Sequence, residues 1–207
     1  MSGISKLWRR LRYGAPVVVV SGLPRSGTSM AMKMLEAGGL VLVSDGQREA
    51  DVDNPKGYYE DERVKDLERS PEREWMLEAR GKGIKVISRL LRSLPAGNFY
   101  QVVLMRRDLG EVLASQSKML ERRGEDAGAD DERMRNLLEK DLWQATYHLK
   151  RAPNFDWLEL QYAEVLADPE GQARRMAAFL DCGLDVERMV TVVDPDLYRN
   201  RAAGAGT

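Results

Sequence analysis

The sequence predicts an α/β fold of three layers, in which helices cover both faces of a central, mostly parallel sheet. Two observations support this prediction. Apolar runs of strand length alternate along the chain with longer segments whose apolar residues recur at helical spacing, and such alternation is typical of parallel sheets. The run from Pro16 to Ser21 also consists almost entirely of valines, the composition of a strand that is buried on both faces.

Five strands are expected from runs rich in β-branched and other apolar residues. The second is followed by a polar loop, Ser44–Glu60, which is too long to be a simple connection and is therefore a candidate functional loop. The expected strands are Pro16–Ser21, Leu40–Val43, Gly83–Ile87, Tyr100–Met105 and Phe155–Leu160.

Helices are expected between these strands, and several have recognisable ends. The Gly38-Gly39 pair ends the first helix. Asp108, with Glu111 three residues later, forms an aspartate variant of the capping box, and Asp168-Pro169 places a cap before a proline at the first helical position. The expected helices are Thr28–Ala37, Asp108–Arg122, Asp131–Arg151, Asp168–Leu180 and Val186–Val193, while Asp61–Ala79 is expected to be helical in pieces.

The composition indicates one globular domain. The chain has 207 residues, of which 43% are hydrophobic and 31% are charged, so a sizeable core and a well-solvated surface are expected. The net charge of −1 provides no overall field that would attract nucleic acid. Cys182 is the single cysteine, which excludes an internal disulfide and a cysteine metal cluster.

The domain is expected to span residues 16–198, with a C-terminal tail at 199–207. Residues 1–15 form a basic N-terminal segment, in which Lys6–Tyr13 mixes cations with aromatics. A membrane-surface helix and a solvated tail are both open for this segment, and we favour the tail. No apolar run is long enough to cross a membrane and no secretory signal is visible, so we expect a cytoplasmic protein.

The strongest functional signal is the loop between the first strand and the first helix. Its glycines, Gly22 and Gly27, allow the backbone to approach an anion closely, and the helix that follows directs backbone N–H groups and its dipole at the same point. The sequence therefore predicts a phosphate-binding loop rather than a plain tight turn. The residues expected to bind are Gly22, Pro24, Arg25, Ser26, Gly27, Thr28 and Ser29.

The cation in this loop argues against one class of enzyme. The Gly22–Gly27 spacing fits the P-loop of nucleotide kinases and NTPases, but that motif places a lysine directly after the second glycine. Thr28 occupies that position here, and Arg25 supplies a cation within the loop instead. A P-loop kinase or NTPase is therefore the alternative rather than the preferred interpretation.

Pro-Arg-Ser-Gly-Thr-Ser after a hydrophobic strand resembles the 5′-phosphosulfate loop of sulfotransferases that use 3′-phosphoadenosine 5′-phosphosulfate (PAPS), in particular bacterial members. That family carries Lys or Arg at the position of Arg25. Its 3′-phosphate motif is an Arg at the end of a strand and a Ser eight residues later, which Arg107 and Ser115 match. The resemblance implies a P-loop-like sulfotransferase fold with PAPS as donor and 3′-phosphoadenosine 5′-phosphate (PAP) as product.

The C-terminal part resembles the family less closely. Tyr162–Leu166, followed by Phe179-Leu180, is similar to a stretch that ends many sulfotransferase domains, although the glutamate is displaced by one position. In some relatives a basic C-terminal loop closes on the 3′-phosphate. Arg199 and Arg201 are candidates for that role, and a solvated basic tail is equally open.

Sulfuryl transfer resembles phosphoryl transfer in depending on the placement of charge, and the resemblance implies no metal. Arg25 is expected to stabilise charge on the leaving oxygen, with Thr28 and Ser29 at the 5′-phosphate. A base must deprotonate the acceptor hydroxyl or amine. The first candidate is Glu60 and its competitors are Asp45, Glu49 and Asp51.

The single histidine, His148, shares one side of a long helix with Asp141. A buried structural pair and a catalytic pair are both open, and we favour the structural pair while keeping His148 as a catalytic candidate. Lys82 and Lys85 are candidates for contact with anionic groups, although alternation along the strand also allows Lys85 to face solvent. The acceptor class is undetermined among small molecules, glycans and lipids, and a nucleotide-binding protein without catalysis is a further alternative.

Overall fold

The computed structural model describes residues 3–45, 59–122, 124 and 131–194. Five parallel strands form one sheet in the order β2-β3-β1-β4-β5, which confirms the predicted α/β class and the parallel pairing. The strands are β1 (Val17–Gly22), β2 (Leu42–Val43), β3 (Gly83–Lys85), β4 (Tyr100–Arg106) and β5 (Phe155–Gln161).

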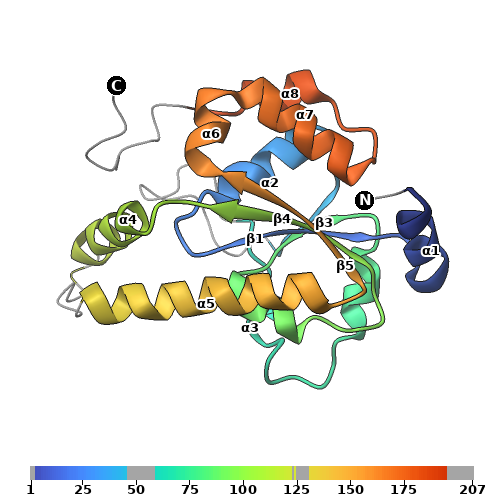
Figure 1. Ribbon diagram of the computed structural model, residues 1–207, viewed down its shortest axis with the longest axis horizontal. Helices are drawn as coiled ribbons and strands as arrows, with labels where there is room; N and C mark the ends of the chain where they lie inside the picture. Colours follow the sequence, from blue (N-terminus) through green and yellow to red (C-terminus); the bar gives the residue numbers. More distant parts are fainter. Residues whose placement is uncertain (1–2, 46–58, 123, 125–130, 195–207) are drawn as a thin grey trace.

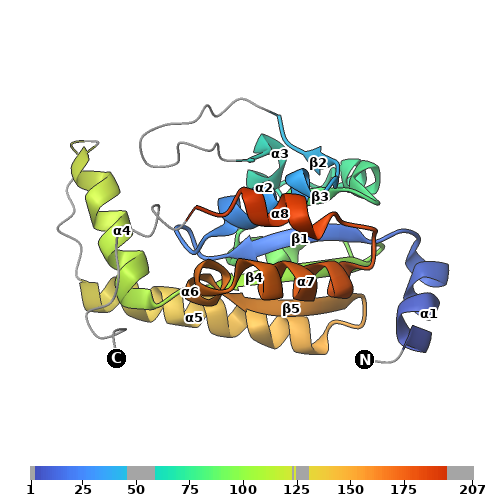
Figure 2. The same cartoon turned by 90° about the horizontal axis from the view of Figure 1, so that it is seen from above.

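The central strands are buried on both faces, as their composition predicts. All six residues of β1 are buried, and their side chains alternate between two cores. Val17 and Val19 belong to one core, and Val18 and Val20 belong to the other. The sheet is therefore covered by a helical layer on each side (Figures 1 and 2).

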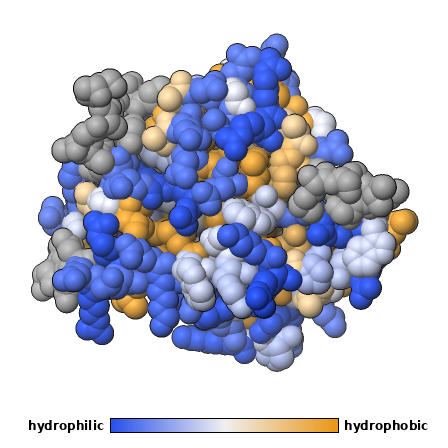
Figure 3. All heavy atoms as spheres, viewed as in Figure 1, coloured by the Kyte–Doolittle hydropathy of each residue, from blue (hydrophilic) through white to orange (hydrophobic). Residues whose placement is uncertain are grey.

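Each layer consists of helices that follow particular strands. One face is covered by α2 (Thr28–Ala37), α6 (Tyr162–Ala167), α7 (Pro169–Leu180) and α8 (Val186–Thr191). The other face is covered by α5 (Asp131–Arg151), α3 (Glu62–Lys65) and two 3-10 helices, η1 (Glu74–Ala79) and η2 (Ser88–Ser93). Figure 3 shows that the face seen in Figure 1 is mostly hydrophilic, with hydrophobic patches between the polar residues.

The helix that carries the second motif, α4 (Leu109–Arg122), begins three residues after the last residue of β4. The predicted cap is confirmed, because Oδ1 of Asp108 accepts a hydrogen bond from the Glu111 amide at 3.1 Å. Similarly, Asp168 caps α7 by accepting from the Gly171 amide at 2.9 Å. These caps fix where α4 and α7 begin.

Two expectations from the sequence are wrong. We favour a solvated tail for the N-terminal segment on sequence grounds, but Gly3–Tyr13 forms a helix, α1. The third strand ends at Lys85 rather than at Ile87, and η2 begins three residues later. No helix in the described part of the chain is both long enough and apolar enough to span a membrane.

Candidate donor-binding site

The loop after β1 is closed by its own serine. The amide and the hydroxyl of Ser26 both donate to the carbonyl oxygen of Leu23, at 3.2 and 2.7 Å. Ser26 is almost fully buried, so its side chain stabilises the turn and leaves ligand binding to the surrounding backbone.

Both glycines of the loop are required by its geometry. Gly22 has φ 153°, and a Cβ there would lie 2.5 Å from Ser26 Oγ and 2.6 Å from the Met105 carbonyl oxygen. Gly27 has φ 96°, and a Cβ there would lie 2.5 Å from the ring of Tyr162. A side chain at either position would therefore displace the backbone that forms the cradle.

Helix α2 begins at Thr28, directly after the loop, and Gly27 provides no side-chain cap. The first N–H groups of an α-helix have no acceptor within the helix and carry its positive partial charge. Thr28 is buried and Ser29 is half-buried beside them. The expected 5′-phosphate donors, Thr28, Ser29 and the adjacent amides, therefore share one corner of the molecule.

Arg25 joins this loop to the second motif. Its backbone has a left-handed φ of 67°, which is uncommon for a residue with a side chain. Its Nε donates to Ser115 Oγ at 3.0 Å, and its carbonyl oxygen accepts from Nη1 of Arg107 at 3.1 Å. The two motifs, which are far apart in the sequence, thus meet at the carboxyl edge of β1 and β4.

Arg107 is held by groups that the sequence did not reveal. Its Nε forms a 2.9 Å ion pair with Glu111, and both side chains are more than nine-tenths buried. The guanidinium also lies over the ring of Tyr162, 4.6 Å from its centre. Burial raises the pKa of the Tyr162 hydroxyl, and the charge of Arg107 partly opposes that rise. The predicted Arg107–Ser115 pair is therefore one part of a buried, charged cluster.

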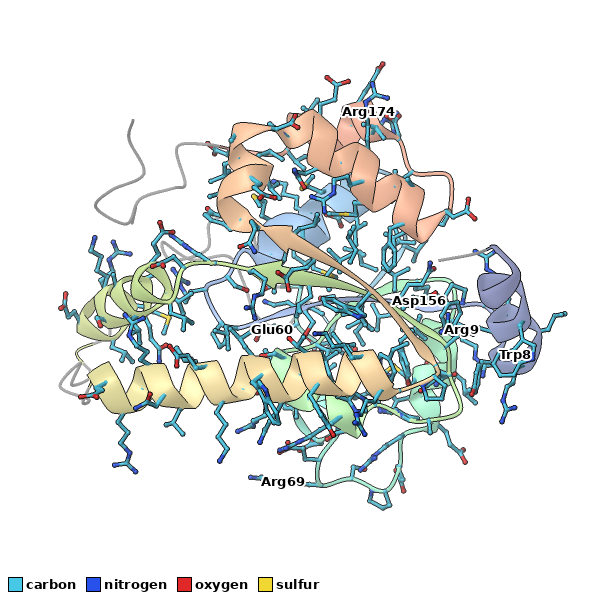
Figure 4. The ribbon with its side chains drawn as sticks, viewed as in Figure 1. Trp8, Arg9, Glu60, Arg69, Asp156 and Arg174 are labelled. Atoms are coloured by element: carbon cyan, nitrogen blue, oxygen red, sulfur yellow. The ribbon has the colours of Figure 1, made fainter. Side chains whose placement is uncertain are left out.

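A second cation approaches the loop from the neighbouring strand. Nζ of Lys85, at the end of β3, lies 3.3 Å from Ser29 Oγ and 3.4 Å from Glu60 Oε1. The side chain of Lys85 is only 10% exposed, so of the two interpretations left open by the sequence, Lys85 contacts an anionic group rather than solvent. Glu60, which Figure 4 labels, is therefore brought to the same edge as the donor loop.

Asp45, a competing base, has a structural role. Its Oδ2 accepts from the Glu62 amide at 2.7 Å, and its own amide donates to the carbonyl oxygen of Glu60 at 3.2 Å. Asp45 thus fastens the end of the preceding segment to the start of α3. The other competitors, Glu49 and Asp51, and the C-terminal cations, Arg199 and Arg201, lie outside the described residues.

With this geometry established, comparison with known proteins identifies the family. A model of the sulfotransferase family matches residues 71–186, which is more than half of the chain. The chain belongs to the sulfotransferase family. The match includes Arg107 and Ser115, whereas the Gly22–Ser29 loop precedes it.

A solved structure shows the same fold. The sulfotransferase domain from the curacin biosynthetic pathway aligns with a TM-score of 0.50 and 12% identity, covering 88% of this chain and 79% of that one. At this identity the alignment supports the fold alone. No curated protein sequence matches the chain.

His148 lies away from the site of this sulfotransferase. Its ring packs edge-on against Phe155, with 5.0 Å between the ring centres, and Phe155 pairs with Tyr100 at the beginning of β4. This is the amino edge of the sheet, opposite the donor loop. Asp141 accepts from Ser88 Oγ at 2.6 Å. The position of His148 thus argues against the catalytic interpretation. The favoured pairing of Asp141 with His148 is replaced by the hydrogen bond between Asp141 and Ser88.

Sequence reasoning missed two site residues, Glu111 and Tyr162, and left the role of Lys85 open. Lys85 is the last residue of a buried strand, and that position at the carboxyl edge was the available signal. Glu111 lies four residues after Arg107, the helical spacing of an ion pair. Tyr162 gave no chemical signal, because its role depends on contacts with Gly27 and Arg107.

Proposed function

We propose that this sulfotransferase transfers a sulfuryl group from PAPS to a hydroxyl or amine of its acceptor. The observation that supports this donor is the Arg25–Ser115 hydrogen bond of 3.0 Å. It joins a phosphate-binding loop to an Arg–Ser pair at one sheet edge. A nucleotide with phosphates at both its 5′ and 3′ positions matches two adjacent anion sites, whereas ATP carries its phosphates in one chain.

The donor end would be bound by the loop and by the start of α2. Gly22 and Gly27 keep the loop backbone in place for phosphate binding, because any side chain there would collide with neighbouring protein atoms. The uncapped N-terminus of α2 and the hydroxyls of Thr28 and Ser29 supply hydrogen-bond donors. Charge-assisted bonds from Arg107, with Ser115, would select the 3′-phosphate.

In the transfer step, the bond between sulfur and the bridging oxygen of the donor breaks while the acceptor oxygen or nitrogen bonds to sulfur. The electron pair of the broken bond stays on the phosphate oxygen of PAP. Arg25 would stabilise the charge that grows there, which is electrostatic stabilisation of the transition state. The proton of the acceptor would pass to Glu60. Among the described base candidates, Glu60 is the one linked to the donor loop, because Lys85 contacts both Glu60 and Ser29.

The P-loop kinase alternative is weaker on chemical grounds. A kinase loop carries the lysine that reaches the β- and γ-phosphates directly after its last glycine, and Thr28 stands there. Lys85 approaches the loop from β3, and the side chain of Arg25, within the loop, donates to Ser115. A nucleotide-binding protein without catalysis would keep this donor site and lack turnover.

Isothermal titration calorimetry with PAP, PAPS and ATP–Mg²⁺ tests the proposal. We expect PAP to bind with micromolar affinity or better and ATP–Mg²⁺ to bind much more weakly. Equal affinity for PAP and ATP would contradict the assigned donor. Slow release of sulfate from PAPS, followed by chromatography, separates an active enzyme from a non-catalytic binder.

A further inference from the structure

Helix α1 turns hydrophobic side chains toward solvent. Trp8 is 50% exposed and Leu11 is 79% exposed, and a spacing of three residues places them on one face of the helix. In the sequence, Ile4 and Leu7 continue the same i, i+3, i+4, i+7 pattern. An amphipathic helix of a globular protein normally buries such a face against its own core. The exposed face of α1 is therefore a candidate surface for binding a partner outside this chain.

The orientation of α1 is fixed by a buried ion pair. Nη1 of Arg9 lies 2.7 Å from Asp156 Oδ1, and its Nε donates to the Pro153 carbonyl oxygen at 2.7 Å. Asp156 is 2% exposed, and its Oδ2 has no hydrogen-bond partner within the described part of the chain. Because a buried carboxylate is costly without its cation, Arg9 holds the helix to the start of β5. Figure 4 shows Arg9 next to Asp156, with Trp8 on the outer side of α1.

The charge of α1 indicates what kind of partner would cover this face. The segment Gly3–Tyr13 contains four cations and no acidic residue, although the whole chain has a net charge of −1. Arg10 and Arg12 are exposed, and the guanidinium of Arg12 lies over the rings of Trp8, at 5.3 Å, and Tyr13, at 5.4 Å. Cations next to exposed Trp and Leu are typical of helices that lie in the interface of an anionic bilayer.

We propose that α1 is a peripheral membrane anchor that places its Trp8–Leu11 face on an anionic lipid surface. Arg10 and Arg12 would contact the headgroups, while Arg9 remains paired with the protein. α1 and α4 lie at opposite ends of the molecule in Figures 1 and 2, so the donor site would face away from the bilayer. This inference goes beyond sulfuryl transfer and does not depend on it.

Vesicle co-sedimentation of the full chain tests the anchor. Vesicles of phosphatidylcholine alone are compared with vesicles that also contain phosphatidylserine. We expect the bound fraction to give a partition coefficient at least about ten-fold higher on the anionic vesicles, and that advantage to fall as salt is raised, because surface electrostatics are screened. Equal partitioning at all salt concentrations, or no binding to either vesicle, would overturn the proposal.

The chain offers a closely matched control. Trp8→Ala/Leu11→Ala removes one exposed Trp and one exposed Leu from α1, and Trp143→Ala/Leu137→Ala removes the same residue types from α5, where they are 64% and 54% exposed. We expect the first pair to abolish vesicle binding without changing PAP affinity, and the second pair to leave vesicle binding intact. Equal losses in the two variants would overturn the assignment to α1. A dimer in solution that only the first variant dissociates, measured by light scattering, would identify a second copy as the occupant instead.

Discussion

Nε of Arg25 donates a hydrogen bond to Oγ of Ser115 at 3.0 Å. One residue belongs to the loop after β1 and the other to the helix after β4, and these two strands are neighbours in the sheet. The bond therefore fixes the distance between the proposed 5′- and 3′-phosphate sites.

Replacing Arg25 should affect turnover more than binding. In the proposed donor complex the backbone of the loop would hold the ground-state phosphate, whereas the Arg25 charge would act on the oxygen that becomes negative in the transition state. Arg25→Ala should lower turnover by about two to three orders of magnitude, and Arg25→Lys should recover much of that loss. Sulfate release at saturating PAPS measures this effect. Unchanged turnover, or complete loss of PAP binding, is inconsistent with the role.

Replacing Glu111 should separate stability from ligand binding. Glu111→Gln leaves the buried Arg107 guanidinium without its charged partner, which should lower the free energy of unfolding of the ligand-free protein by about 2–4 kcal/mol. The 3′-phosphate of PAP then supplies the missing charge, so PAP should raise the Tm more than it does in the wild type. Thermal unfolding with and without PAP measures both effects.

Glu121→Gln, at an exposed position of the same helix, serves as the control and should change neither quantity. If PAP bound more weakly to Glu111→Gln than to the wild type, this prediction would be wrong. Glu111 would then position Arg107 for the 3′-phosphate, instead of competing with that phosphate for Arg107.

Two glycines with the same backbone conformation isolate the steric requirement of the donor loop. Gly27 has φ 96° and Gly39 has φ 97°, but a Cβ would meet the Tyr162 ring at Gly27 and open space at Gly39. Gly39→Ala should cost about 1–2 kcal/mol, the cost of a left-handed L-residue, and keep PAP binding. Gly27→Ala should cost more and lose PAP binding. Denaturant unfolding and calorimetry give these values, and equal behaviour of the two variants would refute the steric argument.

His148 should make the protein less stable in acid. Burial lowers its pKa in the folded protein, while in the unfolded chain the pKa is about 6.5. Between these two pKa values the unfolded state binds more protons, so the free energy of unfolding is highest above the unfolded pKa and falls as the pH drops through the folded one. His148→Leu should remove this part of the pH dependence without altering the turnover of PAPS. Denaturant unfolding at several pH values measures this dependence. If the free energy of unfolding of the variant changed with pH as it does in the wild type, His148 would not be its cause.

The strand, loop and helix of the proposed donor site could be predicted because their signal is local. A valine strand, two glycines and a helix start occur within a few residues, and the eight-residue Arg107–Ser115 spacing is likewise contained in one strand–helix junction. Once the sheet was expected to be parallel, the carboxyl ends of β1 and β4 had to lie at one edge. Short sequence patterns of this kind locate a motif at a particular strand–helix junction.

The remaining features depend on long-range contacts. Period-two alternation assigns Lys85 to a face, but at the end of a strand the side chain turns toward the sheet edge, where it contacts Ser29 and Glu60. His148 occupies a helix of 21 residues, roughly 30 Å long, so helical spacing alone cannot tell which end of the sheet it reaches. The Arg9–Asp156 pair joins residues 147 positions apart, and no local pattern predicts it.

The central claim is that Arg107 binds the 3′-phosphate of the donor. Its most direct test is calorimetry of the wild type and Arg107→Ala with two ligands, PAP and adenosine 5′-monophosphate, which differ only in that phosphate. Arg107→Ala should weaken PAP binding by roughly 1.5–3 kcal/mol, the scale of a hydrogen bond to a charged group, and should leave adenosine 5′-monophosphate binding nearly unchanged. An equal loss for both ligands would contradict the assignment of Arg107 and of the second motif.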